Sequence, residues 1–284
     1  MNQQLRSLLT SLSGLLERSR LGRRMLLVTG RLVARAVTQR PIDFQYVDGC
    51  WFRIDDGAAI PLGGRFNLNR GAMLTWEPRG EEMSRLRRIW WFRHYRPTLG
   101  DFVVDIGAGR GEDTCVLSTA VGPSGKVVAI EAHPKTYAIL DNFVRLNQLP
   151  NVFAEHCAVS DHAGFCFITE ETEELWQCAS LKRGGGTGSK VPAKRIDDLP
   201  QVMEARDIAF LKMNIEGAEV DALQGAPDTL GKTKSVCVCC HDFLGEHTKT
   251  KSAVQRLLVE HGFHLSYAPA GSPPYERDFV YGTR

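Results

Sequence analysis

The chain has 284 residues, 43% of them hydrophobic, a mean hydropathy of −0.20, and 35 Lys+Arg against 33 Asp+Glu, which gives a formal charge of +2 at pH 7. This composition predicts one α/β domain with a smaller attachment, and it excludes wholesale disorder and a polyanion-coating protein. No run reaches about 18 apolar residues, which excludes a membrane-spanning helix, and arginines interrupt every candidate signal-peptide core near the N-terminus.

The N-terminal segment, residues 1–40, is strongly basic. It contains eight Arg and one Glu, a net +7, so the rest of the chain carries −5. Leucines at helical spacing up to Leu16, and apolar residues from Leu21 to Val33, predict two basic amphipathic helices. These helices pack on the body of the protein or on a second copy in a homodimer, or they bind an anionic membrane surface. Nucleic acid is not an expected partner, because Lys is absent and no aromatic residues are interleaved for base stacking.

Residues 41–75 read as short strands, FQYVDG and CWFRIDDG, joined by Gly-rich turns. With the basic helices they make up a predicted N-terminal extension over 1–75. Residues 76–284 form the second predicted domain. It begins with a helix opened by Pro78 and closed by Pro97, whose aromatic side chains we expect in the core.

From Asp101 onwards, strands alternate with helices. Predicted strands cover 102–107, 126–132, 152–159, 208–215 and 235–240, and predicted helices lie near 111–121, 134–147, 218–230 and 249–261. This alternation predicts right-handed crossovers and a mostly parallel sheet with helices on both faces. The last two predicted strands, FHLSYA and RDFVYGT, would close as an antiparallel hairpin at one edge.

The strongest motif is VVDIGAGRGED, residues 103–113. Apolar residues lead into Asp105, which begins a strand-to-helix turn. The turn contains four small residues, Gly107, Ala108, Gly109 and Gly111. Without Cβ atoms at the glycines, a ligand can lie against the backbone at a helix N-terminus. The motif therefore predicts a cofactor site.

The residues after the turn indicate which kind of cofactor the site can bind. A nicotinamide or flavin fold requires a third glycine where Glu112 stands, and Asp113 follows it. Two carboxylates at that helix start would repel a pyrophosphate, whereas they tolerate a ligand with an ammonium and a sulfonium. The pattern therefore disfavours a dinucleotide.

The ends of the next two strands complete the predicted cofactor site. Glu131 ends the second strand, where a carboxylate can accept hydrogen bonds from both ribose hydroxyls of an adenosine, and Ala132 follows it. At the third strand end, we expect Ala158 and Val159, with Ser160, to flank the adenine.

Seven ordered blocks then establish a resemblance. They are VVDIGAGRG (103–111), GPSGKVVAIEAHP (122–134), AVSD (158–161), ASL (179–181), RIDDL (195–199), FLKMNIEGAE (210–219) and a strand ending in His241. From about Trp76 to the C-terminus the chain resembles the FkbM family of S-adenosylmethionine-dependent methyltransferases. The resemblance implies a class I methyltransferase fold, S-adenosylmethionine as cofactor, and methyl transfer to a hydroxyl oxygen, often on sugars, glycolipids or polyketides.

Two residues depart from the family pattern. Arg110 stands where the family commonly has Asn, and Asn214 stands where it commonly has Asp. The first change affects a loop contact, whereas the second bears on the chemistry. We keep Asn214 among the expected cofactor-binding residues.

The acceptor side should lie at the carboxyl ends of the fourth and fifth strands. We expect His241 to take the acceptor proton, with Asp242 as an acidic neighbour and Glu216 orienting either His241 or the methionine ammonium. Glu219 is expected to face solvent or to cap its helix. Mg²⁺ held by Asn214, Glu216, His241 and Asp242 is the weaker alternative, because Asn214 replaces a carboxylate and Mg²⁺ prefers oxygen to imidazole.

The cysteine pattern bears on the compartment. Eight cysteines are scattered among apolar neighbours, so we expect reduced thiols and a cytoplasmic location, at the inner face of the membrane if the basic helices bind lipid. Cys237, Cys239, Cys240 and His241 read as a buried strand rather than a zinc site, because no second Cys/His pair has finger-like spacing.

The expected function is methylation of a hydroxyl on a sugar, glycan or glycolipid. The alternatives are methylation of a polyketide or peptide natural product, and a non-catalytic cofactor-binding scaffold in which Asn214 marks lost chemistry. The Gly- and Lys-rich stretch KRGGGTGSK (182–190) is expected to be a loop near the acceptor mouth.

Overall fold

The computed structural model describes residues 13–64, 66, 81–168, 181–182, 188–242 and 249–284. The first predicted amphipathic helix up to residue 12, Pro78, Cys178 and residues 183–187 of the Gly- and Lys-rich stretch lie outside them. Within the described ranges, none of the helices combines the length and the apolar composition that crossing a membrane requires.

The chain divides into two compact units. The first comprises Met1–Gly80 with Asp141–Gln148, and the second comprises Glu81–Leu140 with Leu149–Arg284. The sequence predicts that the N-terminal extension ends at residue 75. It does not predict that Asp141–Gln148 groups with the N-terminal unit.

The first unit contains a small antiparallel sheet. Its strands are β1 (Asp43–Val47), β2 (Cys50–Asp55) and β3 (Ala58–Gly63), in that order. Each hairpin turns on an Asp-Gly pair, 48–49 and 56–57, and all four residues have positive φ. Two-residue turns of the primed type need this conformation, which explains the Asp-Gly pairs in the sequence.

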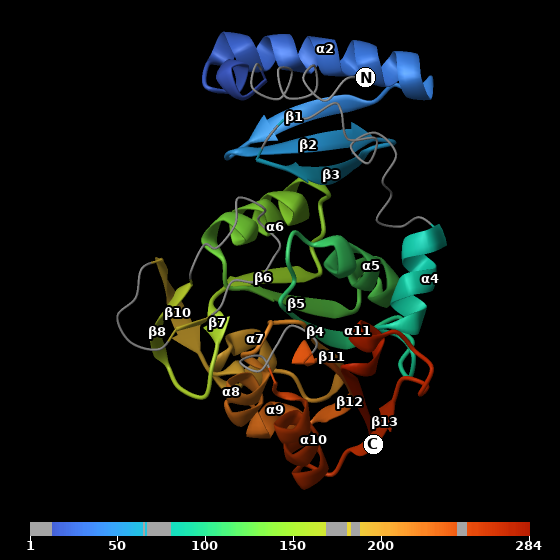
Figure 1. Cartoon of the computed structure of the whole chain (residues 1–284), viewed down its shortest axis with the longest axis vertical. Helices are drawn as coiled ribbons and strands as arrows, with labels where there is room; N and C mark the ends of the chain where they lie inside the picture. Colours follow the sequence, from blue (N-terminus) through green and yellow to red (C-terminus); the bar gives the residue numbers. More distant parts are fainter. Residues whose placement is uncertain (1–12, 65, 67–80, 169–180, 183–187, 243–248) are drawn as a thin grey trace. The chain divides into compact units, whose positions relative to one another are not determined.

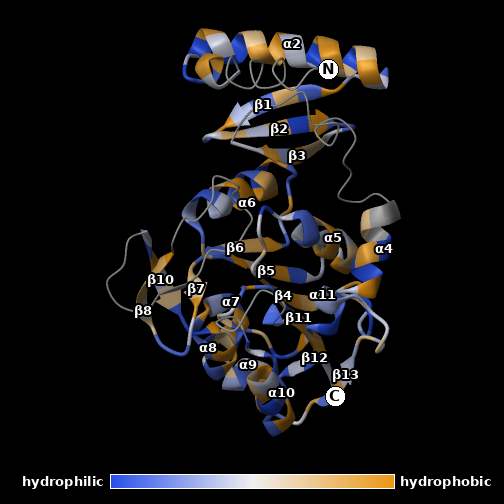
Figure 2. Cartoon of the chain, in the orientation of Figure 1, coloured by the Kyte–Doolittle hydropathy of each residue, from blue (hydrophilic) through white to orange (hydrophobic). Residues whose placement is uncertain are grey.

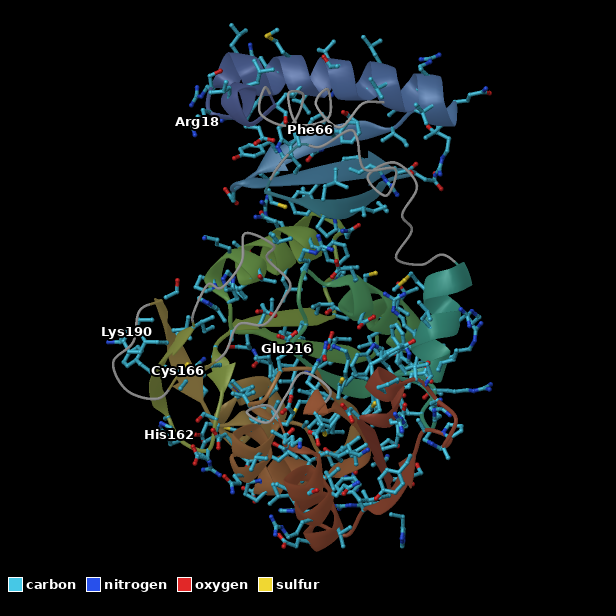
Figure 3. The ribbon with its side chains drawn as sticks, in the orientation of Figure 1. Arg18, Phe66, His162, Cys166, Lys190 and Glu216 are labelled. Carbon is cyan, nitrogen blue, oxygen red and sulfur yellow. The ribbon has the colours of Figure 1, made fainter. Side chains whose placement is uncertain are left out.

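Helix α2 (Arg20–Thr38) packs on this sheet. It begins where Ser19 Oγ accepts the N–H of Gly22 at 2.9 Å. A Cβ on Gly30 would lie 2.5 Å from Phe66 Cζ, so only glycine allows this close approach. Phe66 lies between the helix and the sheet (Figure 3) and packs with Trp51 in a common core.

The second unit is built on a seven-stranded sheet with the order β13-β14-β12-β11-β4-β5-β6 (Figure 1). Its strands are β4 (Phe102–Ile106), β5 (Lys126–Glu131), β6 (Val152–His156), β11 (Ile208–Met213), β12 (Thr233–Cys239), β13 (His264–Tyr267) and β14 (Phe279–Thr283). Strands β4, β5, β6, β11 and β12 are parallel, and β14 runs antiparallel to both β12 and β13. The predicted sheet and its antiparallel C-terminal hairpin are confirmed.

Helices cover the sheet. They are α4 (Glu81–Ile89), α5 (Glu112–Val121), α6 (Pro134–Leu146), α7 (Pro200–Met203), α8 (Glu219–Gln224), α9 (Pro227–Gly231), α10 (Lys251–Glu260) and α11 (Pro274–Arg277), with a 3-10 turn η1 (Ile196–Asp198). Helix α5 lies on one side of the sheet, and α8, α9 and α10 lie on the other (Figure 1). The helix predicted near 218–230 is in fact two short helices, because Pro227 opens a new one after the Gly225 end of the first.

A second, four-stranded sheet was not predicted. It contains β7 (Ala158–Val159), β8 (Gly164–Ile168), β9 (Leu181–Lys182) and β10 (Ser189–Lys194), in the order β7-β10-β8-β9. The strand predicted over 152–159 is therefore wrong as one element: its first part stays in the main sheet and Ala158–Val159 pairs in parallel with β10. Figure 3 labels His162, Cys166 and Lys190 on this part of the chain.

Candidate active site

The glycine turn follows β4, as the motif predicts. Gly107, Gly109 and Gly111 have φ of 71°, 60° and 97°, in the left-handed region that favours glycine. A Cβ on Gly107 would lie 2.0 Å from the carbonyl oxygen of Asn214, so the protein itself fills that side. A Cβ on Gly109 would meet no protein atom nearer than Glu112 Oε2 at 4.0 Å. The absence of a side chain at Gly109 therefore leaves room for a ligand against the backbone.

Glu131 holds the turn from the neighbouring strand end. Its Oε2 accepts the N–H of Gly109 at 2.9 Å, and its Oε1 accepts the N–H of His133 at 2.8 Å. Burial raises the pKa of Glu131 to about 7, against the opposing effect of these backbone hydrogen bonds. Each oxygen retains lone-pair capacity, so the carboxylate can accept further hydrogen bonds from a pair of hydroxyls.

Asp105 lies beneath the turn and is fully buried. In the sheet register it is opposite Lys212, whose Nζ lies 2.7 Å from Asp105 Oδ1. Thr114 donates its hydroxyl to the other oxygen at 2.7 Å. Burial opposes the charge on Lys212, but Asp105 and Asp113 outweigh it and raise its pKa. Both Asp105 oxygens are thus held by protein donors, so this carboxylate positions the turn.

The two carboxylates at the start of α5 also have protein partners. Asp113 lies 2.5 Å from the Nε of Arg87, and Glu112 lies 2.6 Å from an Nη of Arg110. Arg87, which is 1% exposed, also donates to the Glu112 carbonyl at 3.0 Å. Arg110, which stands where the family commonly has Asn, therefore supplies a cation to Glu112.

Sequence reasoning missed Arg87 and Lys212. The signal for Lys212 was a single charge inside the apolar strand IAFLKM, where a buried lysine needs a carboxylate partner. Arg87 carried no comparable signal, because its helix has several arginines and only the fold selects the one that meets Asp113.

The remaining predicted cofactor residues follow or lie on four strands, β4, β5, β7 and β11. Ala108 is buried, and its N–H donates to the Ile130 carbonyl at 3.0 Å. Asn214 is half-buried and donates its N–H to Ile106 at 3.0 Å, which ties the end of β11 to the end of β4. Ala158 and Val159 are buried, and the half-buried Ala132 packs against the cluster that contains Ala158.

The predicted catalytic residues follow β11 and β12. Glu216 and His241 both have a φ of 52°, an uncommon conformation for residues with side chains. Such strained positions concentrate at functional sites. Glu216 is half-buried and has no hydrogen bond or ion pair to any residue in the described ranges. Figure 3 labels it in the second unit, near the carboxyl edge of the sheet.

His241 faces two protein groups. Its Nδ1 lies 3.7 Å from Glu219 Oε1, and its Nε2 lies 3.7 Å from Cys239 Sγ. Burial lowers the pKa of His241, but the hydrogen bonds and charge of Cys239 and Glu219 outweigh burial and raise it to about 10. The imidazole is therefore a cation at neutral pH in this arrangement, and its role as a base stays a prediction.

Glu219 does not face solvent, since its side chain is 0% exposed. It is the first residue of α8, and the N–H of Gly217, which precedes the helix, donates to both of its carboxylate oxygens, at 3.0 and 3.1 Å. The Thr250 hydroxyl also donates to it at 2.8 Å. Neither expectation for Glu219 is met, because its side chain is buried and the start of α8 has no side-chain cap within the described ranges; its burial beside His241 was not predicted.

Asp242 lies at the start of α10 rather than on the imidazole. Its Oδ1 accepts the N–H groups of Thr250 and Lys251 at 2.9 and 3.2 Å. A carboxylate at a helix N-terminus is stabilised by these donors and by the helix dipole. The catalytic role expected for Asp242 stays a prediction. Within the described ranges, no group of three or more His, Cys, Asp or Glu side chains is arranged to hold a metal ion.

Comparison with known proteins identifies the family. The model of the FkbM methyltransferase domain matches residues 105–269. That range contains the glycine turn, Glu131 and both acceptor-side strand ends. Among curated protein sequences, none matches the chain.

Solved structures are similar to the chain at low identity. The FkbM methyltransferase of Methylobacillus flagellatus KT is 18% identical over 74% of this chain and 52% of its own, with a TM-score of 0.49, so this chain spans about half of its length. Aeropyrum pernix fibrillarin with bound S-adenosyl-L-methionine is 13% identical over 86% of this chain and 98% of its own, with a TM-score of 0.42. A SAM-dependent methyltransferase of Aquifex aeolicus is 14% identical over 74% of this chain and 97% of its own, with a TM-score of 0.39.

The family match covers more than half of the chain and agrees with the blocks that carry the sequence resemblance. The seven-stranded sheet, with β14 as its antiparallel member, is the class I methyltransferase fold. The protein belongs to the FkbM family of methyltransferases.

Proposed function

We propose that this enzyme is an O-methyltransferase that transfers the methyl group of S-adenosylmethionine to a hydroxyl of a sugar, glycan or glycolipid. The cofactor is S-adenosylmethionine. The observation that carries the proposal is the Glu131 carboxylate held against the open side of Gly109. A carboxylate at this strand end suits the paired ribose hydroxyls of an adenosine, and the free side of the turn suits the rest of the donor.

The methyl group leaves a sulfonium, so the donor supplies an already activated carbon. A carbon–oxygen bond forms as the carbon–sulfur bond breaks, S-adenosylhomocysteine is released, and the hydroxyl proton must leave. Glu216 is the candidate base for the acceptor, because its carboxylate has no partner within the described ranges and can take the hydroxyl proton as the carbon–oxygen bond forms. Alignment of the two reacting groups supplies the remaining acceleration.

His241 and Glu219 then form a positioning pair. We expect His241→Gln to lower kcat by about tenfold, through a disturbed strand end, and to leave the pH profile of kcat between about pH 6 and 9 unchanged. A wild-type rate that rises with pH towards 10, and a variant that loses this rise, would instead identify His241 as the base. Glu216→Gln measured in the same assay should lose more activity than His241→Gln.

Cofactor affinity should depend on the protonation of Glu131. Hydroxyl donors favour the carboxylate, and its pKa lies at about 7 in the free protein, so affinity should rise with pH through 7. We expect the Kd for S-adenosylhomocysteine to weaken about tenfold from pH 8 to pH 6. Titration calorimetry at both pH values measures this, with Glu131→Gln as the control. If the Kd of Glu131→Gln changes with pH as much as that of the wild type, the pH dependence comes from the ligand or from another group of the protein.

The two glycines of the turn should respond differently to alanine. Gly107→Ala places a Cβ 2.0 Å from a backbone oxygen, so we expect a loss of about 3 kcal/mol or more in unfolding free energy. Gly109→Ala meets no protein atom within 4.0 Å, so it should lose only about 1 kcal/mol from its left-handed φ but weaken S-adenosylhomocysteine binding by at least about tenfold. Urea unfolding and calorimetry separate the two effects. Unchanged affinity in Gly109→Ala would move the cofactor away from the turn.

Label transfer tests the acceptor class. Methyl-tritiated S-adenosylmethionine is added with the enzyme to an extract of the source cells, which is then split into aqueous polymer, lipid and small organic-soluble fractions. Label in a glycan or glycolipid, absent with Glu131→Ala, supports the proposal. Label only in a small organic-soluble product would replace it with natural-product methylation.

A cytoplasmic location is part of this proposal. The described cysteines at 50, 115, 157, 166, 237, 239 and 240 are all buried free thiols, which suits a reducing compartment.

A further inference from the structure

Helix α2 has two apolar faces, and its packing uses only one. The buried face consists of small residues and a single leucine, Gly22, Leu26, Gly30 and Ala34. The other face carries Leu21, Met25, Val28 and Leu32, which are 70%, 53%, 55% and 66% exposed. Their spacing of four, three and four residues places them in one stripe along the helix. We call these four residues the α2 stripe; Figure 2 shows the alternation of hydrophobic and hydrophilic residues along α2.

The larger side chains are thus on the outside. A helix that only covers its own sheet would turn its larger apolar residues inward. Here Gly30 brings the helix backbone close to the sheet, since a Cβ on it would lie 3.1 Å from the ring of Phe44 in β1. Gly22 faces the preceding segment instead, where a Cβ would lie 2.0 Å from the Leu16 carbonyl oxygen. A run of exposed large apolar side chains this regular marks an interaction surface rather than scattered surface residues.

Arginines border the stripe, and the helix itself contains no acidic residue. Residues 18–42 contain no Asp or Glu. Glu17, the nearest acid, is directed at the Trp51 indole, 3.1 Å away. Of the helix arginines, Arg31 pairs with Asp43 at 2.5 Å and Arg23 lies over the Tyr46 ring. Three others are exposed and have no ion pair within the described ranges: Arg20, Arg24 and Arg35.

Helical geometry places these three arginines along one edge of the stripe. At 100° per residue, they lie within about 60° of each other, all on the same side of the stripe. The stripe from Leu21 to Leu32 is about 16 Å long at 1.5 Å per residue. It is therefore an apolar strip with one cationic border on a straight helix held by its sheet.

We propose that α2 lies in the plane of an anionic lipid bilayer, with the α2 stripe inserted between headgroups and the arginine border against lipid phosphates. Such helices insert about 5–10 Å, which is within the reach of Leu and Met side chains on one face. A second copy of the chain fits less well, because α2 offers no acidic side chain to the arginines of a partner. The proposal does not depend on methyl transfer.

Vesicle flotation of the full chain tests this. Vesicles of phosphatidylglycerol with phosphatidylcholine are compared with phosphatidylcholine alone at low salt. The stripe variant is Leu21→Gln/Met25→Gln/Val28→Thr/Leu32→Gln, and the charge variant is Arg20→Gln/Arg24→Gln/Arg35→Gln. The matched control replaces equally exposed apolar residues of the other unit, Leu99→Gln/Met203→Gln/Val259→Gln, whose exposures are 77%, 64% and 57%. All substituted side chains are exposed, and Trp fluorescence verifies that the fold is kept.

We expect the wild type and the control to float with anionic vesicles, the stripe variant to bind at least about tenfold more weakly, and the charge variant to lose the preference for phosphatidylglycerol. Added salt should weaken wild-type binding. Wild-type protein that stays unbound at low salt overturns the proposal. So does a stripe variant that binds like the wild type. A wild-type dimer in lipid-free sedimentation that the stripe variant loses, without vesicle binding, would assign the stripe to a second copy instead.

Discussion

Replacing Glu131 by Ala is expected to weaken S-adenosylhomocysteine binding by about 100-fold or more and to abolish detectable methyl transfer. The substitution removes the acceptor for the Gly109 and His133 N–H groups, which now lie 2.9 and 2.8 Å from its oxygens. In the proposed site it would also remove two hydrogen bonds to the ribose, and each bond to a charged group contributes about 1.5–3 kcal/mol. The turn would lose both its shape and its ligand.

Titration calorimetry with S-adenosylhomocysteine measures this loss. The matched control is Glu155→Ala, which removes a half-buried carboxylate from the neighbouring strand β6, 3.4 Å from Lys194. We expect the control to bind within about threefold of the wild type. A Glu131→Ala protein that binds within fivefold of the wild type would disprove the assigned cofactor site.

Lys212→Met is expected to destabilise the fold by about 3–5 kcal/mol. Lys212 is 2% exposed and neutralises Asp105, which is fully buried, so its removal leaves an uncompensated buried carboxylate. The Trp91 ring, 4.7 Å from Nζ, cannot take over this charge. Urea unfolding followed by circular dichroism gives the free energy.

A double substitution separates charge from packing. Asp105→Asn/Lys212→Met removes both charges, so it should recover a large part of the lost free energy. Lys194→Met breaks the partly exposed pair with Glu155 and should change stability by less than about 1 kcal/mol. If Lys212→Met unfolds within 1 kcal/mol of the wild type, the buried pair of Lys212 with Asp105 does not stabilise the fold as assigned here.

The sequence predicted the parts of the site that depend on local spacing. Glycines at 107, 109 and 111 impose a turn wherever a strand feeds a helix, and one helix and one strand later Glu131 falls at the adjacent strand end. Parallel strands place these ends at one edge, so spacing alone brings Gly109 and Glu131 together.

Partners far apart in the sequence were not predicted. Lys212 lies 107 residues from Asp105, and Arg87 lies 26 residues from Asp113, so only strand order and helix packing select these pairs. Glu219 was assigned to a helix end from its position, but its burial beside His241 depends on how β12 ends against α8. Such long-range pairings leave no periodic signal in the chain.

The second sheet escaped prediction for a different reason. Its strands include two of only two residues, β7 and β9, and β10 contains Pro192, which normally argues against a strand interior. For helix α2, the sequence predicts the element but not which of its faces is buried. Its amphipathic pattern predicts the helix, but the fold buries the small residues, Gly22 and Gly30, and leaves the larger ones outside.

A single-turnover chase tests the central claim most directly. Enzyme in excess binds methyl-labelled S-adenosylmethionine, cell extract is added, and the label and the S-adenosylhomocysteine are followed together, with Glu131→Ala in parallel. The account predicts that the wild type moves its label into a glycan or glycolipid while an equal amount of S-adenosylhomocysteine appears, and that Glu131→Ala yields neither. Wild-type enzyme that binds the donor and keeps its methyl group intact would contradict the account and identify the chain as a cofactor-binding scaffold.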